Sequence, residues 1–329
     1  MYAVECSQLT KEYPHGWKPW RQSEGRKRAL DGLDLQIQRG EIFGFLGQNG
    51  AGKTTTLKLL LGLIYPTSGE ARLLGVPVHA RAGVEIRQRV GYLPENPYFY
   101  EYLTGRELLR YFGRLSGLTG AELEQRVEKR LQQLGLNDVG QVALRKYSKG
   151  MLQRVGMAQA IIHDPELVIL DEPMSGLDPG GRREVREIIL ELKRQGRTVF
   201  FSTHILSDAE MLCDRVAVLE KGRLRGVGPL SAWQGSESGD REIIWRQENR
   251  IGADALRRIN LGAAQTLPEA GKYRITVTSS QLWPALEAIR AAGGEILKLE
   301  AVRPSLEAIF FTQLRPDHEA APIRRETTE

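Results

Sequence analysis

Residues 47–55 read Gly47-Gln-Asn-Gly-Ala-Gly-Lys53-Thr54-Thr55 and lie between two apolar segments. The segment before them, residues 41–46, has the composition of a short buried strand, and residues 55–61 have apolar positions at helical spacing. A glycine-rich turn from a strand into a helix allows successive backbone N–H groups to point toward one anion. The sequence therefore predicts a phosphate-binding loop in an α/β fold.

The residue types in this loop suit a nucleotide triphosphate. Lys53 supplies a point charge for the β- and γ-phosphates, and the Thr54 hydroxyl supplies a ligand for Mg²⁺. A dinucleotide loop would need Gly-x-Gly-x-x-Gly, but after Gly50 and Gly52 the third position is Thr55. A plain flexible turn is disfavoured by the Gly-x-x-x-x-Gly-Lys-Thr pattern in this context. The residues expected around the nucleotide are Gly47, Gln48, Asn49, Gly50, Ala51, Gly52, Lys53, Thr54 and Thr55.

A second buried strand is expected to bring two carboxylates to the same edge of the sheet. Residues 167–170 are an unbroken apolar run, typical of a parallel strand buried on both faces, and Asp171 and Glu172 follow it. We expect Asp171 to hold Mg²⁺ through its water shell, while Glu172 polarises the water that attacks the γ-phosphate. The alternative is that the two acids only close a strand before the turn at Pro173.

A histidine follows the next predicted strand. Residues 198–203 form another buried strand in the prediction, and His204 comes directly after it at the same sheet edge. An imidazole there can donate a hydrogen bond to the γ-phosphate and orient the attacking water. A purely structural histidine is the alternative.

These segments resemble the nucleotide-binding subunit of ATP-binding cassette (ABC) transporters, over about residues 2–228. Besides the phosphate loop, Asp171-Glu172 and His204, the resemblance rests on Tyr147-Ser-Lys-Gly-Met151 followed by Gln153-Arg154, and on Ser175-Gly-Leu-Asp178. It implies an ATPase of the P-loop NTPase class with ATP and Mg²⁺ as cofactors.

In this family two cassettes pair head to tail, and each ATP lies between the phosphate loop of one and the signature segment of the other. The resemblance therefore implies that a second copy of this chain is a partner. Ser148 and Gly150 would bind the γ-phosphate of ATP held by that copy, and Asp178 would join the nucleotide site. Residues 152–162 are expected to be helical, so that a helix N-terminus faces this phosphate.

Two positions depart from the family pattern. The signature reads Tyr-Ser-Lys-Gly-Met where Leu-Ser-Gly-Gly-Gln is usual, so Lys149 adds a positive charge near the shared phosphate. Glu95 stands where the family has a glutamine that links Mg²⁺ and the lytic water to the membrane partner. We expect Glu95 to serve in catalysis and metal binding, although a carboxylate accepts hydrogen bonds and cannot donate them. With these two departures, the sequence resembles the branch of the family that drives ABC-2-type exporters.

Tyr13 occupies the position where the family stacks an aromatic ring on adenine, and a tyrosine that merely ends a strand is the alternative.

Residues 14–28 look like an insertion with two tryptophans and five cations. Such a composition suits a lipid headgroup surface or a partner, and a solvated loop is the alternative. No nucleic-acid partner is expected, because no RNA- or DNA-binding module is present.

The resemblance implies an α/β fold, a P-loop NTPase ABC cassette with a RecA-like core sheet, an antiparallel β subdomain and a helical subdomain. We expect the cassette in residues 1–228, with the helical subdomain at about residues 104–162. Apolar residues at a spacing of three to four mark one buried helix face in that subdomain. They are Leu123, Val127, Leu131 and Leu134.

Beyond the cassette, residues 229–240 have the composition of a linker. Residues 241–315 resemble a small α+β ferredoxin-like domain, and residues 316–329 are expected to be a disordered tail. The expected elements are strands at 242–245, 272–277 and 295–302 and helices at 253–259, 282–292 and 305–314.

The composition is that of a soluble globular protein, because 41% of the 329 residues are hydrophobic and 26% are charged. No apolar run approaches the roughly 20 residues needed to cross a bilayer, and residues 1–6 do not resemble a secretory signal. We therefore expect the chain on the cytoplasmic side of the inner membrane, attached through separate permease subunits. Cys6 and Cys213 are expected to be buried, reduced thiols.

The leading functional hypothesis is the motor of a transporter, in which ATP closes a homodimer, hydrolysis reopens it, and separate permease subunits export a substrate. A soluble ABC ATPase acting on ribosomes or DNA is disfavoured, because the chain has one phosphate loop and no extended heptads. A nucleotide sensor without turnover is disfavoured by Glu172, since a sensor needs no base.

Aromatic residues near Glu95 lie where the family receives a permease helix, with packing between subdomains as the alternative. They are Tyr92, Tyr98, Phe99, Tyr100 and Tyr102.

Overall fold

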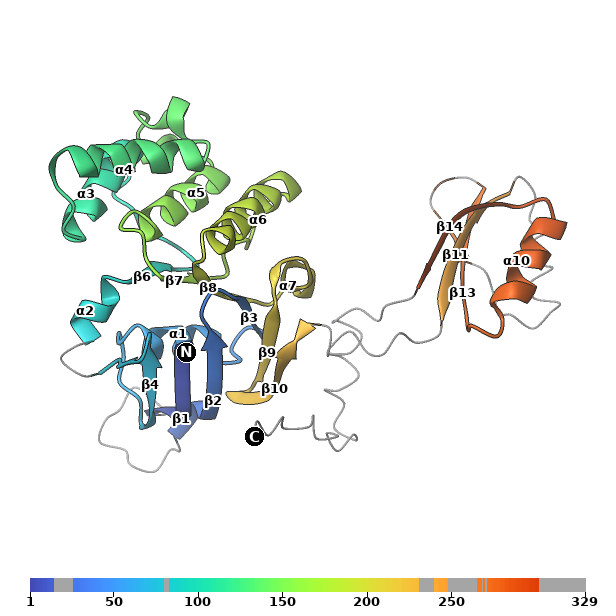
Figure 1. Cartoon of the computed structure of the whole chain (residues 1–329), viewed down its shortest axis with the longest axis horizontal. Coiled ribbons are helices and arrows are strands. Elements are labelled where there is room, and N and C mark those ends of the chain that lie inside the picture. The colour runs from blue at the N-terminus through green and yellow to red at the C-terminus, as the bar shows by residue number, and fades with distance from the viewer. Residues whose placement is uncertain are drawn as a thin grey trace. The chain divides into compact units, whose positions relative to one another are not determined.

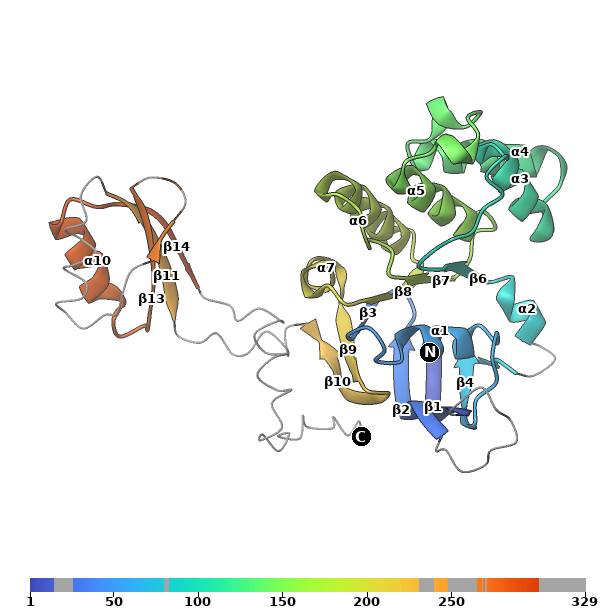
Figure 2. The same cartoon turned by 180° about the vertical axis from the view of Figure 1, so that it is seen from behind.

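The computed structural model describes residues 1–14, 26–79, 83–230, 240–247, 265–267, 269 and 271–301. The chain divides into two compact units, Met1–Leu230 and Ser231–Glu329. Figure 1 and Figure 2 show the two units from opposite sides.

A six-stranded sheet forms the centre of the first unit, in the order β10-β9-β3-β8-β7-β6. Neighbouring strands from β9 to β6 run parallel, and β10 is antiparallel to β9. Every residue of β3, β7 and β8 is buried, as expected for apolar strands covered on both faces. The strands are β3 (Ile42–Leu46), β6 (Val90–Leu93), β7 (Leu167–Asp171), β8 (Thr198–Thr203), β9 (Arg215–Glu220) and β10 (Arg223–Pro229).

A second sheet of the same unit is antiparallel, in the order β2-β1-β4-β5. Its strands are β1 (Tyr2–Pro14), β2 (Arg26–Gln38), β4 (Ser68–Leu73) and β5 (Val76–Pro77). The pairing of β1 with β2 continues to Pro14 and Arg26, so Arg26, Lys27 and Arg28 are strand residues. The predicted insertion at 14–28 is therefore too wide, and its central residues 15–25 lie outside the described part of the chain.

Seven described α-helices accompany these sheets. They are α1 (Lys53–Leu60), α2 (Gly83–Arg87), α3 (Gly105–Leu115), α4 (Gly120–Gln133), α5 (Lys149–Ala160), α6 (Pro179–Arg194) and α7 (Leu206–Leu212), with 3₁₀ turns η1 (Asn137–Val139) and η2 (Leu144–Lys146). In Figure 1, α3, α4 and α5 form one group that stands apart from β1, β2 and β4, and Figure 2 shows the same grouping from behind. The predicted helical subdomain is therefore a separate lobe of this unit.

Local signals set the helices of this lobe. Thr104 and Glu107 form a capping box at the start of α3. The predicted apolar face of α4 is buried, since Leu123, Val127, Leu131 and Leu134 are at most 2% exposed. Helix α5 begins at Lys149 rather than at the predicted residue 152, because the Ser148 hydroxyl caps it by accepting from Met151 N.

The second unit has a four-stranded antiparallel sheet in the order β12-β13-β11-β14. Its described elements are β11 (Arg241–Arg246), β12 (Gln265–Thr266), β13 (Lys272–Val277), α10 (Leu282–Ala291) and β14 (Glu295–Ala301). Trp245, Tyr273 and Ile275 form its core together with Ile289 of α10. This strand order agrees with the predicted ferredoxin-like layer.

Three predictions for this region need comment. Pro229 is the last residue of β10, so the predicted linker at 229–240 starts too early. The helices predicted at 253–259 and 305–314 lie outside the described residues, as does the tail at 316–329.

Strand β6 is held close to the end of helix α5 by a glycine. A Cβ atom at Gly91 would lie 2.1 Å from the Ala160 carbonyl oxygen and 3.0 Å from Pro165 Cγ. We expect Gly91→Ala to destabilise the first unit by roughly 1–3 kcal/mol, because backbone atoms must move. Gly180→Ala is the matched control, since its Cβ would meet only Asp178 Oδ2 at 3.8 Å. Equal urea midpoints for the two variants would contradict this account.

Candidate functional site

The phosphate loop joins β3 to α1 and is pressed against neighbouring backbone. A Cβ atom at Gly47 would lie 2.6 Å from the Leu219 carbonyl oxygen, and one at Gly52 would lie 2.6 Å from that of Ala29. Gly52 also has a φ of 112°, which side chains other than hydrogen rarely permit. Glycine is therefore required at these two positions, and the loop lies directly against β9 and β2.

Lys53 lies at the centre of this loop and is only 6% exposed. Its ammonium donates to the carbonyl oxygens of Gly47 at 2.6 Å and Gln48 at 3.3 Å. It also lies 3.2 Å from Oε1 of Glu172, which is equally buried. Helix α1 begins at Lys53, two residues before the predicted start, so the positive end of the helix lies at the loop.

Ser202 of β8 bonds both acidic residues at the end of β7, Asp171 through its carboxylate and Glu172 through its backbone N–H. Its buried hydroxyl donates to Asp171 Oδ1 at 2.5 Å and accepts from the Glu172 backbone N–H at 3.0 Å. Glu172 has a φ of +50°, a left-handed conformation that costs of the order of 1–3 kcal/mol. The turn at Glu172 directs its side chain away from the strand, toward Lys53 and His204.

The Glu172 carboxylate bridges two functional groups. Its Oε1 faces the Lys53 ammonium, and its Oε2 lies 2.9 Å from His204 Nδ1. His204 is more open, with a side chain 41% exposed. The buried Glu172 carboxylate thus contacts an ammonium on one side and an imidazole on the other.

Two neighbouring groups titrate abnormally. Burial raises the pKa of Tyr92 to about 12, and the negative charge of Asp171 adds to this shift. Burial also raises the pKa of Asp208 on α7, while Arg182 of α6, 3.8 Å away, opposes the shift. Arg182 in turn donates to the Leu177 carbonyl oxygen at 3.3 Å, so α7 is connected to the segment that ends at Asp178.

A cleft of about 670 Å³ lies above the loop. Tyr13 from β1 and Glu95 after β6 both reach it, although they are distant from the loop in the sequence. The structure thus brings these two predicted residues together with most of the loop. The lining residues are Tyr13, Lys27, Arg28, Ala29, Gln48, Asn49, Gly50, Gly52, Lys53, Thr54, Thr55, Glu95, Glu172 and Lys221.

Other predicted residues lie near the cleft or apart from it. Asp171 is buried behind Glu172, and His204 touches Glu172 without lining the cleft. Ser148 caps α5, and Asp178 caps α6 by accepting from Gly181 N at 2.9 Å. Among the described residues, no atom beyond the backbone of helix α5 and the neighbours of Gly150 lies within 4 Å of a Cβ built there, so this position is open.

The signature segment also contacts the segment before α6 within the same chain. The Lys149 side chain lies over Gly176, where an added Cβ would collide with its amine. Gly176 has a φ of +65°, so two separate constraints favour glycine there. Lys149 therefore rests on the chain's own Ser175–Asp178 segment in this structure.

Sequence reasoning missed several residues of the site. Lys27 and Arg28 were assigned to a basic insertion, but both line the cleft from β2. Ser202 was read only as part of a strand, and its one signal is a buried hydroxyl in an apolar run. Lys221 carries no such signal, because hairpin turns favour Asn, Asp or Gly at the position that it occupies.

Comparisons with known proteins agree with this geometry. Residues 30–175 match the family model described as ABC transporter. The chain is 44% identical to an uncharacterized ABC transporter ATP-binding protein of Synechocystis over 95% of its own length and 84% of the relative's. It is 40% identical to a Nod factor export ATP-binding protein of Paraburkholderia xenovorans over 67% and 72% of the two chains.

A solved structure of an ATP-binding subunit of an ABC transporter has the same fold. It superimposes with a TM-score of 0.61 at 33% identity, covering 70% of this chain and 92% of the other. The cassette fold and nucleotide binding predicted from the sequence are therefore confirmed.

The Ser202 bridge leads to a testable expectation. Ser202→Ala removes the donor to Asp171 and the acceptor for Glu172 N, so we expect a stability loss of roughly 1–3 kcal/mol. ATP turnover should fall as well, because the Glu172 N–H loses one of its two acceptors and keeps only the Ser202 carbonyl oxygen. Ser116→Ala is the control, since the Ser116 hydroxyl donates to the Phe112 carbonyl oxygen of its own helix, at the end of α3. Denaturation and phosphate release measure both effects, and unchanged turnover in Ser202→Ala would contradict the idea.

Proposed function

Since the chain belongs to the family of ABC transporter ATP-binding proteins and is an ATPase, we propose that it drives an exporter whose membrane pore is a separate polypeptide. The observation that carries this proposal is the Glu172 carboxylate, which contacts both Lys53 and His204 at the rim of the cleft. A relative whose name includes export supports the direction of transport.

The residues of the cleft suggest how ATP is held. The ammonium of Lys53 takes the β- and γ-phosphates, and the N–H groups at the start of α1 face the same anion. Tyr13 is 37% exposed at the end of β1 and lines the cleft, which suits stacking on adenine. The remaining loop residues from Gly47 to Thr55 surround the phosphates.

Glu172 and His204 are proposed as the catalytic pair. Glu172 accepts a proton from the attacking water, and the His204 contact at 2.9 Å holds the carboxylate in position. Lys53 would exchange part of its contact with Glu172 for phosphate oxygens when ATP binds. This exchange would release Glu172 toward the attacking water, so that the base is available only in the nucleotide complex.

Mg²⁺ is proposed as the metal that accompanies ATP, and Thr54, Asp171 and Glu95 would hold it. Among the described residues, no cluster of three or more His, Cys, Asp or Glu side chains is arranged to bind a metal. This fits Mg²⁺, which is usually held by one or two carboxylates, water and substrate phosphates. When bound, Mg²⁺ would neutralise charge that develops on the phosphates.

A second copy of the chain is proposed to complete each site. Ser148 and Gly150 lie at the start of α5, and the open surface at Gly150 leaves room for a phosphate. The N-terminus of this helix of 12 residues would face the γ-phosphate held by the other copy. Asp178 would approach the same nucleotide from the start of α6.

Mixing two inactive variants tests the head-to-tail arrangement. Lys53→Ala and Ser148→Arg damage opposite halves of a composite site, so a mixed dimer keeps one complete site. We expect equal mixtures to recover up to roughly a quarter of native turnover, since half of randomly paired dimers are mixed. Lys53→Ala mixed with Glu172→Gln is the control, because both changes fall in the same half. Recovery in neither mixture would rule out this arrangement.

The permease is proposed to dock on aromatic residues beside Glu95. Tyr98 and Tyr102 are 98% and 72% exposed, and the Tyr100 ring packs against Tyr102 and Tyr111. Exposed tyrosines are common at protein interfaces. No described helix is sufficiently long and apolar to traverse a bilayer. The chain would then lie on the cytoplasmic side of the inner membrane, held there by the permease.

A pull-down from solubilised native membranes tests this docking. Tagged Glu172→Gln protein with Mg-ATP should recover a polytopic membrane protein, and adding Tyr98→Ser and Tyr102→Ser should reduce recovery severalfold. Tyr65→Ser is the matched control, because Tyr65 is 73% exposed and stacks on His79. Recovery of ribosomal or nucleic-acid proteins in place of a membrane protein would favour a soluble ATPase.

A further inference from the structure

Lys221 lies in the turn between β9 and β10 and is one of the residues that line the nucleotide cleft. Within the part of the chain that the structure describes, no hydrogen bond or ion pair occupies its ammonium. Arg28, which lines the same cleft, is by contrast engaged by Glu12 and Asp31. Lys221 therefore adds a positive charge to the cleft that none of the described residues pairs with.

The backbone conformation of this turn does not favour a lysine. Strand β9 ends at Glu220 and β10 begins at Arg223, so Lys221 and Gly222 form a two-residue hairpin loop. Their φ angles are +47° and +81°, and such turns favour Asn, Asp or Gly at the first position. A lysine in the left-handed region costs roughly 1–2 kcal/mol. The side chain is thus held in a backbone position that other residues would fill more favourably.

Backbone hydrogen bonds fix this turn against the phosphate loop. Gly222 N donates to the Ala51 carbonyl oxygen at 2.8 Å, and Gly222 O accepts from Asp31 N at 2.8 Å. A Cβ atom at Gly222 would lie 2.9 Å from the Ala29 carbonyl oxygen, so the strands approach closely. The position of Lys221 relative to the start of α1 is therefore well defined.

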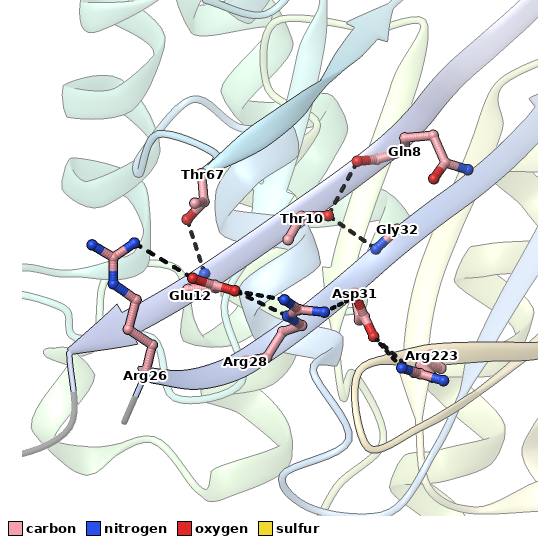
Figure 3. Close-up of polar contacts among 9 residues, drawn as sticks. All are labelled: Gln8, Thr10, Glu12, Arg26, Arg28, Asp31, Gly32, Thr67 and Arg223. Carbon is pink, nitrogen blue, oxygen red and sulfur yellow. Dashed lines mark hydrogen bonds and ion pairs between the residues drawn. The ribbon is translucent and has the colours of Figure 1, made fainter. Parts of the chain in front are cut away.

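Figure 3 shows a chain of ion pairs that runs from Glu12 of β1 through β2 to Arg223, the residue after the Lys221–Gly222 turn. Asp31 lies between Arg28 and Arg223, with both contacts at 2.7 Å. Arg28 continues to Glu12 at 2.9 Å. Glu12 precedes Tyr13, and Arg223 follows the Lys221 turn, so the network connects the proposed adenine side to the turn.

We propose that Lys221 is a nucleotide-binding residue whose ammonium contacts the α- or β-phosphate of a purine nucleoside diphosphate or triphosphate. This inference rests on the nucleotide site proposed above. Phosphates are the anionic part of the nucleotide, and the Lys221 turn is bonded to Ala51 of the loop that binds them. Lys27 also lines the cleft, but it pairs with Tyr13 across the sheet, at the end proposed for the base.

Calorimetric titration of Lys221→Asn with ADP and with adenosine tests the proposal. Asparagine suits the turn, so the variant should fold and be as stable as the native chain, or more so. We expect the Kd for ADP to rise roughly three- to tenfold, with adenosine binding unchanged, because only ADP carries the phosphates. The dependence of ADP binding on salt should weaken in the variant, since one charge contact is lost.

Two further variants separate the possible failures. Lys129→Gln removes a charge from an exposed position of α4 and should leave ADP binding unchanged. Lys53→Ala should weaken ADP binding strongly if the nucleotide site is correctly assigned. Native ADP affinity in Lys221→Asn, beside a weakened Lys53→Ala, would overturn only the role of Lys221. Native affinity in both variants would overturn the site itself, and equal losses for adenosine and ADP would assign Lys221 a structural role.

Discussion

The contact between Lys53 and Glu172 is the interaction on which the site depends. Both side chains are 6% exposed and approach to 3.2 Å, so each charge is compensated in a place where water cannot do so. Lys53 belongs to the loop after β3, and Glu172 follows β7, two strands away in the sheet. One ion pair therefore connects the element that binds phosphate to the element that supplies the base. Removing either partner would leave a buried charge, which is much more costly than losing an exposed pair.

Much of this arrangement was predictable from the order of residues along the chain. Glycine spacing before Lys53 and apolar runs that end at Asp171 and at Thr203 place the functional groups at one sheet edge. The resemblance to a known family added Tyr13 and Glu95, which are remote from the loop in sequence but line the same cleft. Such signals work because strand ends in a parallel sheet are fixed by the fold.

The parts that could not be predicted depend on contacts between distant segments. Ser202 looks like any hydroxyl in a strand until β8 is placed beside β7, where it bonds both carboxylate residues. Arg28 looks like part of a basic insertion, but pairing of β1 with β2 places it between Glu12 and Asp31. The start of α5 was misplaced by three residues, because Ser148 was read as a ligand-binding residue and not also as a cap. The sequence pattern does not specify cross-strand partners or caps that serve two purposes.

The position of Lys149 over Gly176 has a consequence for cooperativity. If the two copies pair head to tail, the signature segment of one chain serves the nucleotide of the other, and the Ser175–Asp178 segment lies near the same boundary. Because the Lys149 side chain lies against Gly176 within one chain, a shift of the signature segment when nucleotide binds would be passed to the Ser175–Asp178 segment through this one contact. Such coupling is reciprocal by thermodynamic necessity. The usual glycine at position 149 has no side chain to make this contact, so in a head-to-tail dimer Lys149 would be the residue through which the two nucleotide sites are joined.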